Sequence, residues 1–113
     1  MKTENCDVVV VDCLTLWLSN LILADDIDDD TIEEEVSAFL SVIQSRRYHL
    51  ILVTNEVGMG IVPENELARR FRDVAGRTHR RIAKIADQVY CGQMGVMLRL
   101  KPGPVESVTM ETT

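Results

Sequence analysis

The sequence predicts an α/β fold built around a parallel sheet. Two apolar runs of strand length, residues 7–13 (DVVVVDC) and 49–54 (HLILVT), are separated by a long stretch with helical periodicity. A strand, a helix and a second strand in this order favour parallel pairing through a right-handed crossover. Because the first run is almost entirely apolar, we expect its strand to be buried on both faces. The 113 residues are enough for one small domain.

The segment between the two strands predicts two helices and a loop. Residues 14–23 (LTLWLSNLIL) are strongly apolar and predict a short helix packed on the sheet, with Trp17 in the core or at an interface. Residues 24–30 (ADDIDDD) predict an exposed loop, since their carboxylates repel one another. A longer helix should follow, capped by Thr31 or Asp30. Its apolar face recurs at helical spacing: Ile32, Val36, Phe39, Leu40 and Ile43.

The second half of the chain predicts a long helix and a hairpin. A loop is expected at residues 55–65 (NEVGMGIVPEN). Pro63, near the end of this loop, is placed to begin the long helix. Its apolar stripe is formed by Leu67, Phe71, Val74, Thr78, Ile82 and Ile85. Short strands at 88–91 and 96–101 flank a turn at 92–95. We therefore predict one domain over residues 1–101 and a flexible tail over 102–113.

Charge and cysteine content limit the possible partners. The net charge of −6 argues against nucleic-acid binding. Seven basic residues nevertheless cluster in the long helix, where they could bind phosphates or form a solvated face that pairs with the acidic helix: Arg69, Arg70, Arg72, Arg77, Arg80, Arg81 and Lys84. His79, in the same helix, is expected at the surface. The three cysteines lack C-x-x-C spacing, and no signal peptide or membrane span is apparent, so we expect a cytoplasmic protein with reduced thiols.

Two groups of polar residues follow the predicted parallel strands. The VVVVDC run has the form of a Walker B segment, in which Asp12 would hold a magnesium ion beside nucleotide phosphates, although a buried strand ending in Asp is also common. The second strand leads into Thr54, Asn55 and Glu56, which either face a ligand or tie down their own loop. The matching phosphate loop, G-x-x-x-x-G-K-[ST], does not occur in these residues.

Several longer motifs resemble one enzyme family. VDCLTLWLSNL, VTNEVGMGIVPENELARRFRDVAGR, ADQVY and LRLK are similar to the bifunctional adenosylcobinamide kinase/adenosylcobinamide-phosphate guanylyltransferase family of cobalamin synthesis. The resemblance spans residues 8–101 and implies a three-layer, RecA-like P-loop fold that assembles as a trimer. It also implies phosphorylation of adenosylcobinamide by ATP or GTP with Mg²⁺, then GMP transfer from GTP through a guanylylated histidine.

The resemblance assigns nucleotide binding to Asp12, which would also contact the metal, and more weakly to Asn55 and Glu56. The family's phosphate loop and guanylylated histidine have no counterpart here, because His49 and His79 do not substitute. We therefore expect an N-terminally truncated fold, no catalytic residue in this chain, and activity only with the missing half. The alternative is a non-catalytic or split-subunit oligomerisation module.

The resemblance also places the missing phosphate-loop strand between residues 49–54 and 88–91. Its absence predicts strand closure across the gap, self-association through exposed edges, or pairing with a separate N-terminal chain.

Overall fold

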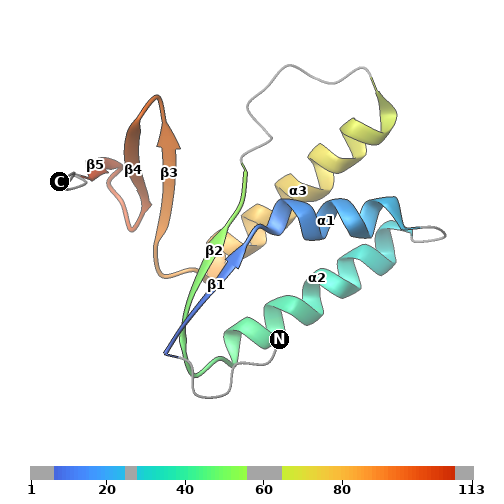
Figure 1. Ribbon diagram of the computed structural model, residues 1–113, viewed down its shortest axis with the longest axis horizontal. Coiled ribbons are helices and arrows are strands. Elements are labelled where there is room, and N and C mark those ends of the chain that lie inside the picture. The colour runs from blue at the N-terminus through green and yellow to red at the C-terminus, as the bar shows by residue number, and fades with distance from the viewer. Residues whose placement is uncertain (1–6, 25–27, 56–64, 109–113) are drawn as a thin grey trace. The chain divides into compact units, whose positions relative to one another are not determined.

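A computed structural model describes residues 7–24, 28–55 and 65–108, and it divides into two compact units, Met1–His79 and Arg80–Thr113 (Figure 1). The first unit contains the parallel sheet and the helical core, and the second contains an antiparallel sheet. The elements in chain order are β1 (Val8–Asp12), α1 (Leu14–Leu23), α2 (Asp29–Gln44), β2 (His49–Val53), α3 (Glu66–Ile85), β3 (Val89–Gln93), β4 (Val96–Lys101) and β5 (Glu106–Val108).

The strands β1 and β2 pair in parallel, which confirms the predicted parallel pairing. Their register runs from Val8 opposite His49 to Asp12 opposite Val53. Both strands therefore end at the same edge of the sheet. Two helices, α1 and α2, lie between them in the chain.

The prediction that the first strand is buried on both faces was wrong. Val8 and Val10 are 52% and 58% exposed, and Ile51 on the partner strand is 51% exposed. Val9 and Val11 on the other face are half-buried. Side chains of a strand alternate between faces, so a sheet covered on one face shows this pattern. The described part of the chain therefore leaves one apolar face of the β1–β2 sheet uncovered.

The helical core of the first unit follows the predicted apolar faces. Trp17 of α1 packs against Phe39 of α2 with ring centroids 5.0 Å apart, which supports a packing role for this tryptophan. Thr78 is also buried, and its hydroxyl donates to the carbonyl of Val74 in the preceding turn. The buried apolar residues are Leu14, Leu18, Ile22, Ile32, Val36, Leu40, Ile43, Val74 and Ala75.

Helix α2 begins earlier than the sequence indicated. Asp28 is its N-cap, and a carboxylate oxygen of Asp28 accepts a hydrogen bond from the Thr31 amide at 2.8 Å. The assignment of Thr31 or Asp30 as the cap was wrong, because Asp28 already satisfies the amide three residues on. Asp29 and Asp30 therefore lie in the first turn, where the helix dipole favours acidic side chains.

Replacing Asp28 by alanine should lower the thermal unfolding midpoint at neutral pH. The hydrogen bond from the Thr31 amide lowers the pKa of Asp28 below its ordinary value. A carboxyl whose pKa is lower in the folded state stabilises the fold above its unfolded pKa, and this contribution is lost as pH falls through the folded pKa. Asp28→Asn keeps an acceptor but cannot titrate, so it should show a weaker acid dependence. Circular dichroism melts over acidic to neutral pH test both, with Asp30→Asn as control. An unchanged acid slope in Asp28→Asn would contradict the assignment.

Helix α3 is capped by Asn65. Its side-chain oxygen accepts hydrogen bonds from the amides of Leu67 at 2.8 Å and Ala68 at 3.2 Å. The helix therefore begins at Glu66, whereas Pro63, the predicted opening residue, lies outside the described residues.

Ion pairs link α3 to the acidic helix α2. Arg70 contacts Asp29 at 2.9 Å, and Arg77 contacts Glu33 at 3.3 Å. Of the two interpretations of the basic cluster, these contacts support pairing with the acidic helix. Each pair is partly exposed, so each is expected to contribute less than about 1 kcal/mol.

The second unit contains the predicted hairpin and one further strand. The turn between β3 and β4 is the two-residue step Met94–Gly95, with φ values of 52° and 78°, so β3 extends further than expected. The predicted loose tail differs from the structure at residues 106–108, where β5 pairs with β4. A side-chain ion pair between Arg99 and Glu106 accompanies this pairing. The prediction of a loose tail failed because side-chain periodicity along the sequence reveals neither an ion pair nor a strand of only three residues.

Within the described ranges, β1–β2 and β3–β4–β5 form separate sheets. The three outcomes predicted for the gap, strand closure, self-association and pairing with a separate chain, stay predictions.

Candidate functional site

The carboxyl edge of the parallel sheet holds the first predicted site residue. Asp12 is the last residue of β1 and is exposed, and its register partner Val53 is the last residue of β2. Ligands of α/β proteins bind outside the carboxyl ends of parallel strands. The side chain of Asp12 is thus available to solvent at the edge where this class of fold binds its ligands.

Three side chains from three elements are hydrogen-bonded at the same edge. The Thr54 hydroxyl, just after β2, lies 2.8 Å from Nε2 of His79 on α3. It also lies 3.3 Å from the Thr15 hydroxyl on α1. The Asn55 amide donates to that Thr15 hydroxyl at 3.1 Å. These contacts join α1, the end of β2 and α3 immediately beside the register position of Asp12.

The structure tests only part of the prediction for the polar residues that follow β2. Thr54 and the Asn55 backbone are held by hydrogen bonds within the chain, which favours one of the two interpretations for these two residues, while the Asn55 residue as a whole stays exposed. Glu56 lies outside the described residues, as does most of the loop at 55–65. A nucleotide-binding role for Asn55 and Glu56 therefore stays a prediction.

His79 is the residue that the sequence analysis missed. It was expected at the surface, but it is half-buried and bonded to Thr54. Its position was nevertheless indicated by helical spacing. His79 lies four residues after buried Ala75 and three before half-buried Ile82, so it borders the apolar stripe. Helical spacing could not indicate the hydrogen-bond partner of His79, because Thr54 is 25 residues away in the chain.

Asp12 does not belong to a cluster of metal-binding side chains within the described residues. Within residues 7–24, 28–55 and 65–108, no group of three or more His, Cys, Asp or Glu side chains could hold a metal ion. Magnesium commonly takes only one or two carboxylates and fills its other positions with water and phosphate oxygens. The donor set therefore fits a nucleotide-bound Mg²⁺ better than a metal held by protein ligands alone. Cys13 and Cys91 are free thiols, as predicted for these two cysteines.

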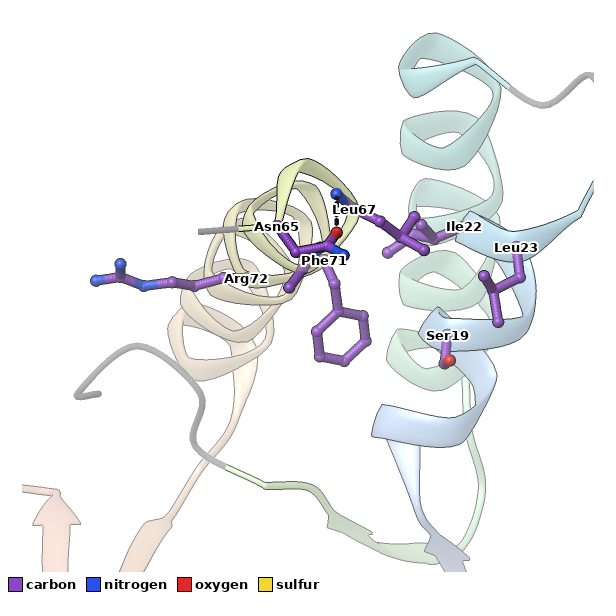
Figure 2. A pocket seen from close by; sticks show the side chains of 8 residues that line it. Ser19, Ile22, Leu23, Asn65, Leu67, Phe71 and Arg72 are labelled. Atoms are coloured by element: carbon purple, nitrogen blue, oxygen red, sulfur yellow. Dashed lines mark hydrogen bonds between the residues drawn. The ribbon is translucent and has the colours of Figure 1, made fainter. Parts of the chain in front are cut away.

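An apolar cavity of about 460 Å³ lies elsewhere in the first unit (Figure 2). It is formed by the second half of α1 and the start of α3, whereas Asp12 ends β1 and Thr15 lies in the first turn of α1. Figure 2 shows Leu67 and Phe71 on the side of α3 that faces α1, and Arg72 extending away from it. Most of the lining is apolar, and Arg72 is the charged residue among those that line the cavity. Its lining residues are Ser19, Ile22, Leu23, Asn65, Leu67, Ala68, Phe71 and Arg72.

None of the described helices is long and apolar enough to cross a membrane.

Comparison with known protein families shows which family the chain belongs to. The family model described as cobinamide kinase / cobinamide phosphate guanyltransferase matches residues 1–100. The chain belongs to this family. The match includes β1 with Asp12, β2 and all of α3, and so covers the edge described above.

Curated relatives of the chain are longer proteins. The bifunctional adenosylcobalamin biosynthesis protein CobU of Salmonella typhimurium is 38% identical over 84% of this chain and 59% of its own. CobP of Pseudomonas aeruginosa is 41% identical over 86% of this chain and 55% of its own. CobU of Escherichia coli is 37% identical over 84% of this chain and 59% of its own. The chain thus spans less than three-fifths of the length of these relatives.

Proposed function

We propose that this chain contributes the metal- and nucleotide-binding edge of an adenosylcobinamide kinase/adenosylcobinamide-phosphate guanylyltransferase. The observation that carries the proposal is the exposed carboxylate of Asp12 at the carboxyl end of a parallel strand, inside the segment that matches the family. The substrates would be adenosylcobinamide and a purine nucleotide, either GTP or ATP, with Mg²⁺ as the cofactor.

In this proposal Asp12 holds the magnesium ion or one of its water ligands. The ion would neutralise charge on the nucleotide phosphates, and such neutralisation with positioning accounts for most of the catalysis of phosphoryl transfer. Thr15 comes three residues after Asp12, and Asn55 comes two residues after Val53, the register partner of Asp12, so both add neutral hydrogen-bonding groups at the same edge. Asn55 and Glu56 are the further nucleotide-binding candidates.

The groups that grip the triphosphate would come from outside these 113 residues. No G-x-x-x-x-G-K-[ST] segment occurs in the sequence, so neither the phosphate-binding amides nor the lysine is supplied here. We propose that residues 1–101 form part of a larger RecA-like, three-layer P-loop domain. The uncovered face of Val8, Val10 and Ile51 supports this proposal, because parallel sheets normally have both faces covered.

A second candidate is an oligomerisation module without catalytic function. The same uncovered apolar face favours it, since a second copy or a separate chain carrying the phosphate loop could cover that face. A trimer is the assembly that the family resemblance suggests. Sedimentation analysis gives the oligomeric state, and the role of Asp12 separates the two candidates, because an oligomerisation module has no need of its carboxylate.

Asp12→Asn should weaken Mn²⁺ binding by roughly tenfold or more, since the amide keeps the shape but loses the charge. Mn²⁺ replaces Mg²⁺ here because free Mn²⁺ can be counted by electron paramagnetic resonance. Asp30→Asn, in the first turn of α2, is the matched control and should leave the Asp12 site unchanged. Equal Mn²⁺ affinity in wild type and Asp12→Asn would refute the metal role and favour the oligomerisation module.

A further inference from the structure

The hydrogen bonds around Thr54 connect a histidine of α3 to the edge that carries Asp12. Thr54 lies between His79 Nε2 at 2.8 Å and the Thr15 hydroxyl at 3.3 Å. A hydroxyl has one hydrogen to donate and lone pairs to accept, so Thr54 can serve both partners at once. Thr15 in turn accepts the Asn55 amide. The four groups therefore form a continuous chain of hydrogen bonds.

This chain of bonds restrains two groups that would otherwise be free to move. Thr54 and Asn55 follow the last residue of β2 and are both exposed, so no sheet pairing and little packing hold them. Thr15 stands in the first turn of α1, three residues after Asp12. His79 is half-buried on a 20-residue helix whose face is anchored by Val74, Ala75 and Thr78. His79 is therefore held by its helix, whereas Thr54 and Asn55 depend on these hydrogen bonds for their position.

We propose that His79 is a positioning residue of the nucleotide site. Through Thr54 it fixes the Thr15 hydroxyl, which accepts the Asn55 backbone amide, at the edge where β1 ends in Asp12. The edge then presents one arrangement of the Thr15 hydroxyl, the Asn55 side chain and the Asp12 carboxylate to a magnesium-bound phosphate group. The inference rests on the proposed function for its ligand, but the restraint itself concerns only this chain. Preorganisation of this kind raises affinity because fewer groups must be ordered when the ligand binds.

Two substitutions at His79 separate positioning from general stability. Glutamine places its amide nitrogen close to the position of Nε2 and can keep the bond to Thr54, whereas the shorter asparagine does not reach it. His79→Asn should weaken binding of Mn²⁺·GTP roughly three- to tenfold, the effect of one lost hydrogen bond, and His79→Gln should restore it. His49→Asn is the matched control, because His49 is exposed at the opposite end of β2.

The test uses the full 113-residue chain labelled for NMR, with thermal melts to confirm that each variant folds. Affinity comes from line broadening by Mn²⁺·GTP, and restraint comes from hydrogen exchange of the Asn55 amide. We expect faster Asn55 exchange in His79→Asn, near wild-type exchange in His79→Gln, and no change in His49→Asn. Unchanged Asn55 exchange in His79→Asn, or equal behaviour of the Asn and Gln variants, would overturn the inference.

The two proposals fail in different ways. If the wild-type chain showed no broadening with Mn²⁺·GTP, the proposed function of the edge would fail, and Asn55 exchange would still decide whether His79 orders it. If wild type bound and His79→Asn bound equally well, the function would stand and the positioning role would be refuted.

Discussion

Replacing Leu18 by alanine is expected to destabilise the first unit by about 2–5 kcal/mol, the range observed for large-to-small changes in packed cores. Leu18 is the most deeply buried residue of α1, with an exposed fraction of 0%. It lies on the same helix face as Leu14 and Ile22, which are 1% and 4% exposed. Alanine at this position would remove apolar contacts and leave a cavity that the surrounding helices fill only in part.

The effect should be large relative to the total stability. Small domains are stabilised by only about 5–15 kcal/mol, and a chain of this size lies near the lower end. Urea unfolding followed by circular dichroism measures the change. Leu16→Ala is the matched control, because Leu16 is on the same helix but 62% exposed, and it should stay within about 0.5 kcal/mol of wild type. Similar losses in both variants would contradict the described core.

The second large effect concerns activity. We expect the 113 residues alone to show no turnover of adenosylcobinamide with Mg²⁺·GTP or Mg²⁺·ATP. Phosphoryl transfer needs backbone amides and a lysine to seat the triphosphate, and neither is present in a phosphate-loop motif in this sequence. Removing a single donor that stabilises a transition state typically lowers kcat by about 10²–10³, so removal of a whole cradle should abolish measurable rates.

The measurement is a chromatographic assay for phosphorylated and guanylylated corrinoid products. A full-length relative, such as the Salmonella typhimurium protein, serves as the positive control for substrate and conditions. Product formation by the purified chain above the rate of an Asp12→Asn sample would contradict the proposal that the triphosphate-binding groups lie outside these residues. It would mean that some other group among these residues seats the triphosphate.

Much of the fold could be predicted because its signals are local. The valine run predicted β1, the spacing of apolar residues from Ile32 to Ile43 predicted α2, and the glycine-containing turn predicted the hairpin. Asp12 was placed at the sheet edge for the same reason, since it directly follows a strand whose direction is set by the crossover. These features depend on the periodicity of side chains along one element.

The errors concern choices between competing residues or contacts between distant ones. Asp28, Asp30 and Thr31 are all acceptable caps, and only geometry shows which carboxylate reaches the free amide. Burial of β1 on both faces requires a second layer, which local apolarity cannot guarantee. The His79–Thr54 bond joins residues 25 positions apart, so no single-element pattern contains it.

The most direct measurement is a residue-by-residue map of line broadening by Mn²⁺·GTP on the labelled chain. If the carboxyl edge of β1 and β2 is the functional site, amides of Asp12, Thr15 and Asn55 should broaden first, and Asp12→Asn should abolish the effect. Broadening centred instead on the apolar cavity near Leu23 and Phe71, or retained in full by Asp12→Asn, would show that the site lies elsewhere.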